Sequence, residues 1–447
     1  MSLRQSTVSG DRRIPGVGLP ATIADARVLV IGGGPAGAAC AIRLRQLGIA
    51  VALAERSPFP RFKVCGCCLG PAGIAGLASL GCDAPLRRAA TPVRMWHGAF
   101  DGRGVRIPLR HGVIVSREVL DPLLLEQARD VGVSVLQPAA ATVRAAGYDS
   151  VRVRLSFPAA GHSGPGTART PARTPARTPA GTPAGYGMPV DAEVPIVVFA
   201  SGLNGAGRWL PWIEPPRGPI GVAGRLAGRD GAEAGVVYMA CDPLGYVGWV
   251  RTSDDQTVVA AAIRPRPGRG SDAPGGQRRD RSGVSAIRQT VWGMLQRSGL
   301  PRPVPEPSPV PESEADGGSG DWRDPWYVGD WFATGPLRRR RLAGRGRLLA
   351  IGDAAGYVEP FTGEGMTWGI LAGIAAADRI AAGADREPEI GDLWAQELPR
   401  RMGARMRRCG RLSAALRSSW VRAAAGTFLG TFPRLSRPII RQLERPL

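Results

Sequence analysis

The chain has 447 residues and a hydrophobic fraction of 44%, which is ordinary for a globular protein of two or three lobes. No run of about 18 consecutive apolar residues is present, and residues 1–26 form a polar, flexible leader without the apolar core of a secretory signal, so we expect a cytoplasmic protein. The net charge of +21 comes almost entirely from arginine, and no zinc finger or RNA-recognition motif accompanies it, which argues against specific nucleic-acid binding.

The first predicted unit consists of a strand, a glycine-rich turn, a helix and a second strand. Residues 27–31 form a short apolar run typical of a buried parallel strand, and 38–47 is rich in Ala, Leu and Arg, which favour a helix. Residues 51–54 predict the second strand. Four such elements within about 30 residues are typical of a βαβ unit.

The turn within this unit has the spacing G-x-G-x-x-G, which indicates a dinucleotide site in this context. Gly32 permits the tight turn, Gly34 lets the backbone approach a pyrophosphate, and Gly37 lets the helix pack closely on the strand. Glu55 ends the second strand, where an acid accepts hydrogen bonds from ribose hydroxyls. The predicted cofactor residues here are Gly32, Gly34, Pro35, Ala36, Gly37, Glu55 and Arg56.

The middle of the chain predicts one helix, two strands and an insertion of low complexity. We expect a helix at 121–131 with Asp121 as its cap, and a half-exposed strand at 151–157, where Val and Leu alternate with Arg. Residues 159–189 contain Thr-Pro-Ala-Arg and Thr-Pro-Ala-Gly repeats, whose Pro and Gly content cannot bury a core, so we expect a disordered insertion. A buried-strand pattern resumes at 194–200.

The C-terminal half predicts a second sheet and a late strand followed by a helix. Residues 236–239 and 257–263 favour strands of the second sheet, 348–351 favours a buried strand, and 366–382 favours a long helix. Loops are expected at 268–283, at 301–320 and, because of four successive arginines, at 338–341.

A second motif begins where the late strand ends. Asp353, within Gly-Asp-Ala-Ala-Gly, stands where an acid binds a ribose or ribityl hydroxyl. Glycines that precede Met366 place bare backbone N–H groups at the start of a helix, which suits the electron-rich edge of a reduced flavin. The predicted cofactor residues here are Gly352, Asp353, Pro360, Gly363, Gly365 and Met366.

The pairing of these two motifs resembles the para-hydroxybenzoate-hydroxylase-like FAD proteins, and within them most closely the geranylgeranyl reductase branch. The segment 60–66, Pro-Arg-Phe-Lys-Val-Cys-Gly, is similar to the Pro-Arg-x-Lys-x-Cys-Gly segment of that branch. Arg117, with Leu120 and Asp121, resembles the family's Arg-x-x-Leu-Asp, whose Arg lies near the FAD. By this resemblance Cys65 lies near the flavin, where a thiol can deliver a proton.

The resemblance implies an α/β fold in which a doubly wound, Rossmann-like FAD-binding domain of the glutathione-reductase type is interrupted by a mixed β-sheet substrate domain. C-terminal helices follow. The implied FAD-binding domain is discontinuous and comprises 27–92, 111–158, 190–212 and 336–385. The implied substrate domain comprises 93–110 and 213–335, and the Arg-rich C-terminal helices occupy 386–447.

The substrate domain carries aromatic residues that are candidates for lining an apolar cavity. The segment around Tyr246 and Trp249 resembles the branch's Tyr-x-Trp-x-Phe-Pro motif with one residue inserted, and Phe361 lies within the second motif. For each of these aromatics, packing in the core is the alternative. Three clustered cysteines at 65, 67 and 68 do not have the spacing of a zinc site, so no metal is expected.

The activity implied by the resemblance is the reduction, by hydride from reduced FAD, of carbon–carbon double bonds in a hydrophobic isoprenoid or similar lipid. The alternatives are an NAD(P)H-using monooxygenase of an aromatic or polyketide-like substrate, and a non-catalytic basic flavoprotein that binds a membrane or polyanion. A halogenase is disfavoured, because it needs a lysine at the far end of a tunnel and the only lysine is Lys63.

The partners expected are a hydrophobic small molecule and an electron donor. No second dinucleotide fingerprint is present, so the donor is transient NAD(P)H or a ferredoxin-like protein. The segment 398–447 combines Arg clusters with aromatic and aliphatic residues. It favours either a pair of helices packed on the FAD-binding domain or an interfacial helix that contacts a membrane peripherally.

Overall fold

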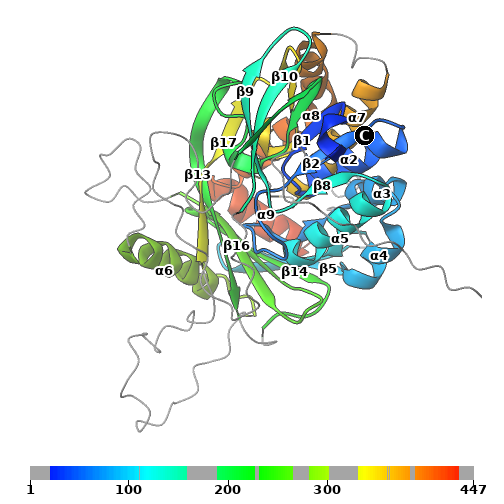
Figure 1. Ribbon diagram of the computed structural model, residues 1–447. Helices are drawn as coiled ribbons and strands as arrows, with labels where there is room; N and C mark the ends of the chain where they lie inside the picture. The colour runs from blue at the N-terminus through cyan, green and yellow to red at the C-terminus, as the bar shows by residue number, and fades with distance from the viewer. Residues whose placement is uncertain are drawn as a thin grey trace, which may run out of the picture.

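The computed structural model describes residues 21–109, 111–158, 189–226, 231–264, 281–301, 331–359, 361, 363–382 and 388–431. Two large sheets organise it, with helices packed on the first sheet and one long helix, α6, on the outer side of the second (Figure 1). The predicted insertion at 159–188 and most of the predicted loops at 268–283 and 301–320 lie outside the described residues.

The first sheet is the parallel sheet that the βαβ unit predicted. Its strand order is β18-β19-β12-β1-β2-β8, and only the pair β18 and β19 is antiparallel. Strands β1, β2 and β12 are buried at every position, as the continuous apolar runs require. The strands are β1 (Val28–Ile31), β2 (Val51–Ala54), β8 (Ser134–Leu136), β12 (Ile196–Phe199), β18 (Gly344–Arg345) and β19 (Leu348–Ala350).

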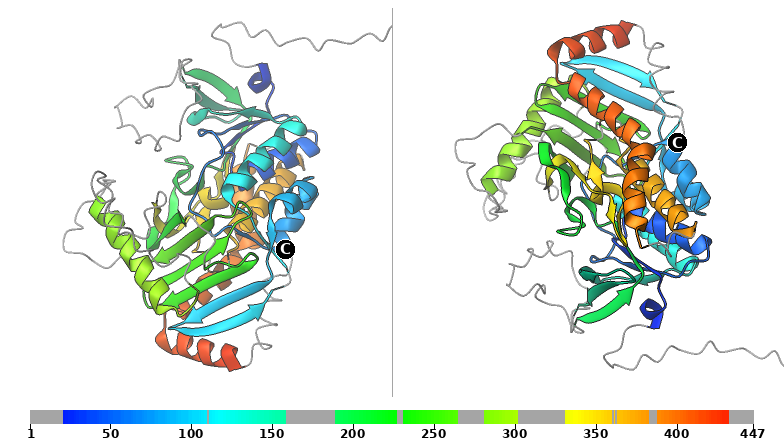
Figure 2. Two further views of the ribbon diagram at one scale, coloured as in Figure 1. Left: turned by 90° about the horizontal axis from the view of Figure 1, so that it is seen from below. Right: turned by 90° about the horizontal axis from the view of Figure 1, so that it is seen from above.

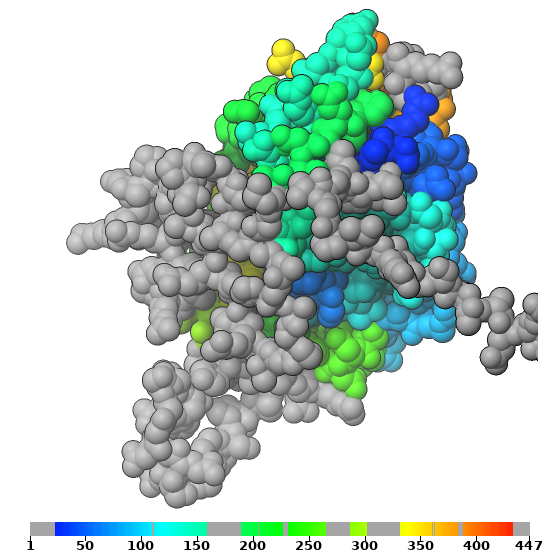
Figure 3. All heavy atoms as spheres, viewed as in Figure 1, coloured from blue at the N-terminus to red at the C-terminus, as the bar shows by residue number. Residues whose placement is uncertain are grey.

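Helices cover this sheet and a small antiparallel sheet extends from it. The helices are α1 (Ala21–Ala24), α2 (Pro35–Gln46), α3 (Pro71–Ser79), α4 (Asp83–Ala89), α5 (Arg117–Asp130) and α7 (Gly365–Ala381). The small sheet has the order β11-β10-β9 and comprises β9 (Ala140–Ala146), β10 (Val151–Ser156) and β11 (Val190–Val194). In the space-filling view, the blue residues of the βαβ unit adjoin the cyan residues of the helical layer (Figure 3).

The second sheet has eight strands in the order β20-β17-β13-β16-β15-β14-β5-β6, and it is mixed because β14 and β5 pair in parallel. Its strands are β5 (Met95–Phe100), β6 (Arg103–Pro108), β13 (Trp212–Leu226), β14 (Val236–Asp242), β15 (Gly245–Arg251), β16 (Thr257–Ile263), β17 (Trp331–Arg341) and β20 (Gly356–Tyr357). Helix α6 (Arg281–Arg297) packs on β14 and β15. The remaining elements are β3 (Cys68–Leu69), β4 (Thr91–Pro92), β7 (Val113–Ile114) and two 3-10 turns at Gly202–Asn204 and Gly352–Ala354.

The expected buried strand at 194–200 is confirmed as β12, although Val194 belongs to the end of β11. Two local expectations were wrong. Helix α5 begins one turn earlier than expected, at Arg117, so Asp121 is an interior residue and Ser116 stands at the helix start. The arginines at 338–341 belong to strand β17 rather than to a solvated loop, and Arg339 is buried.

Helices α2 and α7 cross in close contact, and glycines make this contact possible. A Cβ on Gly373 of α7 would lie 2.3 Å from the carbonyl oxygen of Ala36 and 3.0 Å from the nitrogen of Cys40. Gly369, one turn earlier, lies against the same Ala36. This crossing brings the N-terminal ends of α2 and α7 to the same region of the first sheet (Figure 1).

The C-terminal segment forms two helices, α8 (Ile390–Ala415) and α9 (Ser419–Thr431), that pack on different parts of the molecule. Helix α8 contacts β18, β19 and α7 of the first sheet, whereas α9 contacts β5 and β6 of the second (Figure 2). The expectation that both helices pack on the FAD-binding domain is therefore wrong for α9. None of the described helices has the length and apolar character needed to cross a membrane.

Candidate functional site

The glycine turn has the geometry that its sequence predicted. Gly32 has φ +114°, and a Cβ there would lie 2.5 Å from the carbonyl oxygen of Ala200, so no other residue fits. A Cβ on Gly37 would lie 1.9 Å from the carbonyl oxygen of Gly32. Helix α2 begins at Pro35, and none of the described side chains caps it, so its first N–H groups remain for a ligand.

Glu55 ties the end of β2 to this turn. Its Oε2 accepts a hydrogen bond from the Gly33 N–H at 2.8 Å, and its Oε1 accepts one from the Ser57 N–H at 2.9 Å. A carboxylate has about four acceptor positions, so lone pairs remain for ribose hydroxyls. Glu55 is buried, whereas the neighbouring Arg56 is exposed.

A buried cluster of charges lies beside the turn. Asp121 is 0% exposed, and its two oxygens accept from Arg117 at 2.6 and 2.8 Å and from Lys63 at 2.9 Å. Burial alone raises the pKa of Asp121, but the charges of Arg117 and Lys63 prevail and hold it below its usual value. Two cations share one anion, so the cluster retains positive charge.

The space in front of this cluster fits an anion. A Cβ built on Gly34 would lie 3.2 Å from Nη2 of Arg117 and 3.8 Å from Nζ of Lys63, with nothing else of the described residues within 4 Å. Arg61 adds a buried Nε that has no hydrogen-bond partner among the described residues. Bare backbone, an uncapped helix start and three cationic side chains are what the pyrophosphate of FAD requires.

The second motif reaches the same cluster. Burial raises the pKa of Asp353 to about 6, and the charges of Arg117, Arg339 and Lys63 oppose that rise, so the carboxyl lies within their electric field. Gly352, with φ +56°, turns the chain from β19 toward Asp353. The two motifs therefore meet at one site, although most of the chain separates them in sequence.

Helix α7 presents its start to this site. It begins at Gly365, and none of the described side chains caps it. Gly363 has φ +74° and packs against the side chain of Cys68, while Met366 is buried beneath the helix start. Pro360 lies outside the described residues.

Cys65 is half-buried, and its sulfur accepts a hydrogen bond from the backbone of Cys67. The Cys67 N–H donates to Sγ of Cys65 at 3.4 Å, and the left-handed backbone of Cys67, with φ 56°, makes this bond possible. The thiol of Cys67 and then the charge of Arg117 lower the pKa of Cys65 to about 7. Burial raises the pKa of Cys68 to about 12, so only Cys65 of this pair exchanges a proton near neutral pH.

The expected aromatic lining is only partly present. Tyr246 and Phe361 meet edge to face with ring centroids 5.2 Å apart, and they line a pocket with Glu359, Ser413 and Arg417. Trp249 does not join them, and this prediction was wrong. It is 1% exposed and stacks on Tyr238 in the core between the second sheet and α6, because residues three apart on a strand point to opposite faces.

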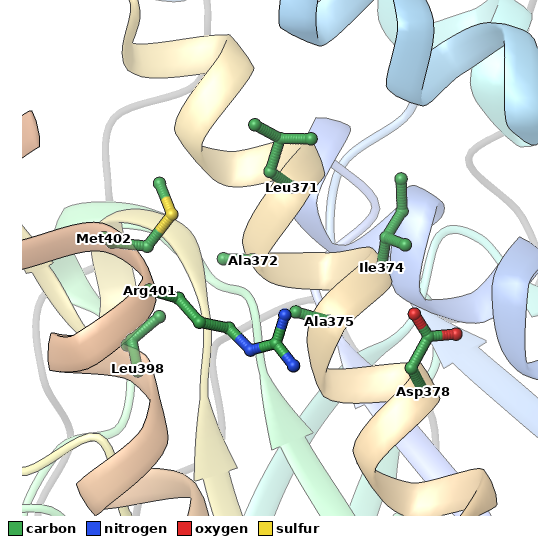
Figure 4. Close-up of a pocket in the computed structure, with 8 residues that line it drawn as sticks. All are labelled: Leu371, Ala372, Ile374, Ala375, Asp378, Leu398, Arg401 and Met402. Carbon is green, nitrogen blue, oxygen red and sulfur yellow. The ribbon is translucent and has the colours of Figure 1, made fainter. Parts of the chain in front are cut away.

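A separate groove lies between α7 and α8 (Figure 4). Its lining is apolar apart from Asp378 and Arg401 at the rim, and Asp378 is engaged by Arg43 of α2 at 2.7 Å. The α7 residues that line it begin at Leu371, more than a turn beyond the helix start at Gly365. The groove is therefore distinct from the charge cluster.

The sequence did not predict the positions of three residues of this candidate site. Asp121 was assigned to a helix cap, although its spacing of four residues from Arg117 was the available signal for a pair on one helix face. Arg339 was hidden among four successive arginines, yet it alone of them is buried and donates to the carbonyl oxygen of Leu203 at 3.0 Å. Arg61 carried no signal beyond the family segment.

Residues 25–165 match a protein family described as FAD binding domain. This part of the chain, about a third of its length, is similar to FAD-binding domains. The match spans β1, α2, β2 and α5, which carry the glycine turn, Glu55 and the charge cluster. The predicted cofactor, FAD, is confirmed.

Known relatives agree with this domain. Menaquinone reductase of Mycobacterium tuberculosis is 27% identical over 396 residues, which are 85% of this chain and 81% of that protein. Among solved structures, the p-nitrophenol 4-monooxygenase of Pseudomonas putida DLL-E4 has a TM-score of 0.65 at 15% identity and covers 94% of this chain and 97% of its own. The flavin-dependent halogenase CmlS has a TM-score of 0.58 at 20% identity and covers 83% of this chain and 62% of its own.

These likenesses confirm the expected fold class, in which an FAD-binding domain is combined with a mixed sheet and C-terminal helices. With the family match, they support the expected FAD-dependent oxidoreductase. The resemblance to the para-hydroxybenzoate-hydroxylase-like proteins is confirmed at the level of the fold. The narrower resemblance to geranylgeranyl reductases stays a prediction.

Proposed function

We propose that this protein is a reductase that uses FAD to saturate carbon–carbon double bonds in an isoprenoid or similarly apolar substrate. The observation that carries the proposal is the Cys65 thiol, whose pKa of about 7 is set beside the cation cluster of the FAD-binding domain. A further support is the relative named menaquinone reductase, because menaquinone is a quinone with an isoprenoid side chain.

The residues present fit FAD. Gly34, the start of α2 and the cations Arg61, Lys63 and Arg117 would hold the pyrophosphate, and the N-terminus of α7 would lie beside the electron-rich edge of the ring system. Glu55 would accept from the adenosine ribose and Asp353 from the ribityl chain. Reduced FAD supplies the hydride when it is bound.

The chain itself supplies the proton. Saturating a double bond needs a hydride at one carbon and a proton at the other, so an acid with a pKa near the working pH is the most effective donor. Sγ of Cys65 holds such a proton, and Arg117 stabilises the thiolate that remains after its transfer. Water then returns a proton to the thiolate.

Tyr246 and Phe361 provide an apolar wall for the substrate. Burial raises the pKa of Tyr246 well above its usual value, so the phenol stays neutral. This aromatic pair offers apolar contact to a hydrocarbon chain, while the ion pair of Glu359 and Arg417 lines the other side of the same pocket. This environment supports a lipid-like substrate.

Anaerobic single turnover tests the proposal. The holoenzyme is reduced with dithionite, mixed with menaquinone or a polyprenyl diphosphate, and followed by flavin absorbance and by mass spectrometry of the product. We expect flavin reoxidation and a product that still carries two additional hydrogens after any quinol has been reoxidised to the quinone in air. A product that gains one oxygen atom, only in air and with consumption of NAD(P)H, would identify a monooxygenase instead.

Cys65→Ser provides the matched variant, with Cys68→Ser as its control. We expect Cys65→Ser to keep its FAD and to slow product formation about 10²-fold or more, while Cys68→Ser stays close to the parent rate. The pH profile of the parent should show an ionisation near the pKa of about 7 that Cys65→Ser lacks. Retention of that ionisation in Cys65→Ser would exclude Cys65 as the donor.

A further inference from the structure

Helix α9 is fixed on the outer end of the second sheet. Arg422, which is buried, donates to Asp101 at 2.8 Å, and Arg103 of β6 donates to Thr427 at 2.6 Å. Gly426 brings the helix close to Phe100 of β5. One face of the helix is therefore firmly attached, and its position at the end of the molecule is visible in both views of Figure 2.

The opposite face of α9 is apolar and exposed. Trp420 is 85% exposed, Phe428 is 51% exposed and Val421 is 38% exposed. Trp420 and Phe428 are eight residues apart, with Ala424 midway, which places the three on one stripe of the helix. Within the described residues 419–431 the only charged side chain is Arg422, and it is on the attached face.

The chain around this stripe is uniformly basic. No acidic residue occurs between Glu397 and Glu444, whereas this stretch contains eleven arginines. Arg407, Arg408 and Arg411 are exposed on the last turns of α8. Three of the eleven arginines form ion pairs, Arg401 with Glu397, Arg417 with Glu359 and Arg422 with Asp101, so the net positive charge beside the stripe comes from exposed arginines such as Arg407, Arg408 and Arg411.

We propose that α9 docks on an anionic lipid membrane, with Trp420, Val421 and Phe428 at the boundary between headgroups and acyl chains. The neighbouring arginines then meet lipid phosphates, because the negative surface potential of such a membrane attracts basic side chains. Charge complementarity selects this ligand. A second copy of the chain would bring two basic surfaces together and is disfavoured.

Docking on a membrane also gives the substrate a route into the site, and this step rests on the proposed function. Ser413, Leu416 and Arg417, at the junction of α8 and α9, line the same pocket as Tyr246 and Phe361. The pocket therefore begins where the proposed membrane contact ends.

Vesicle co-sedimentation of the full-length holoprotein tests the docking. We expect binding to phosphatidylcholine vesicles that contain phosphatidylglycerol, and at least tenfold weaker binding to pure phosphatidylcholine. The double variant Trp420→Ser, Phe428→Ser should lose at least tenfold in affinity for the anionic vesicles. Tyr148→Ser, at an aromatic residue that is 75% exposed on the other lobe, is the control and should bind as the parent does.

Equal binding of the parent and the double variant to the anionic vesicles would overturn the proposal. Equal binding of the parent to vesicles with and without phosphatidylglycerol would overturn it as well. Light scattering adds an independent check: a parent that is dimeric and a double variant that is monomeric, without vesicle binding, would assign the stripe to a second copy of the chain. Vesicle binding is measured without turnover. Docking that persists when no isoprenoid is reduced would leave this inference intact and remove the proposed function.

Discussion

The region around the parallel sheet and the region of the second sheet place their candidate site residues in different ways. In the first, a glycine turn with short sequence spacing is combined with charges from distant parts of the chain, as Gly34, Lys63 and Arg117 show around Asp121. In the second, aromatic residues lie along extended strands, and the alternation of the strand decides which of them reaches the site. Polar motifs can therefore be predicted from sequence, whereas an apolar lining depends on register.

The largest expected effect concerns the buried anion of the first region. Asp121→Ala leaves Arg117 and Lys63 without their partner, and breaking a buried ion pair in this way costs about 3–5 kcal/mol of unfolding free energy. We also expect loss of bound FAD. Asp378→Ala is the control, because Asp378 pairs with Arg43 at a similar 2.7 Å but at an exposed site. Chemical denaturation and flavin content measure both variants, and equal costs would refute the role of burial.

The second region is tested by replacing each of its two predicted aromatic residues, Trp249 and Tyr246, with alanine in separate variants. Trp249→Ala removes a core ring and should cost about 3–5 kcal/mol of unfolding free energy, with kcat/KM little changed if the variant is assayed while folded. Tyr246→Ala should cost less stability and lower kcat/KM about tenfold or more, because its ring lines the pocket. A large loss of kcat/KM in Trp249→Ala together with a large loss of stability in Tyr246→Ala would mean that the two side chains point to the opposite faces of β15 from those described.

The contact between α2 and α7 gives a smaller effect. Gly373→Ala forces a Cβ toward the Ala36 carbonyl oxygen, at 2.3 Å in the unrelaxed structure, and should cost about 1–3 kcal/mol while weakening FAD binding. Gly403→Ala, on α8, is the control. Its Cβ meets only the movable side chain of Arg407, so the helix propensity of alanine should raise stability by up to about 1 kcal/mol. Thermal denaturation of the two variants distinguishes the outcomes.

The smallest expected effect is a pH dependence at Asp353. Its pKa is raised from the usual 3.8 to about 6, so the folded protein binds the proton more tightly and the stability of the FAD-free protein falls as pH rises between these values. Asp353→Asn removes that loss. The variant should gain about 1–3 kcal/mol over the parent above pH 6, and nothing below pH 4, while it binds FAD less tightly. A constant difference across this range would contradict the assignment.

The sequence predicted most of the first sheet and its cofactor motifs because each motif lies within one strand–turn–helix unit. Gly32, Gly37 and Glu55 follow from local spacing alone. It did not predict Asp121 as an anchor, because the partnership with Lys63 joins residues 58 apart in the chain. Trp249 was misplaced because an inserted residue in the family motif changed the face of the strand to which the side chain points.

The crossing of α2 and α7 has a consequence for synthesis. The glycine turn emerges from the ribosome more than 300 residues before Asp353 and Gly365, the predicted cofactor residues of the second motif. A nascent polypeptide that stops in the second sheet therefore lacks this second set of predicted cofactor contacts. Flavin loading should be among the last events of maturation, and the yellow colour of a preparation then reports the fraction of chains that were finished and correctly assembled.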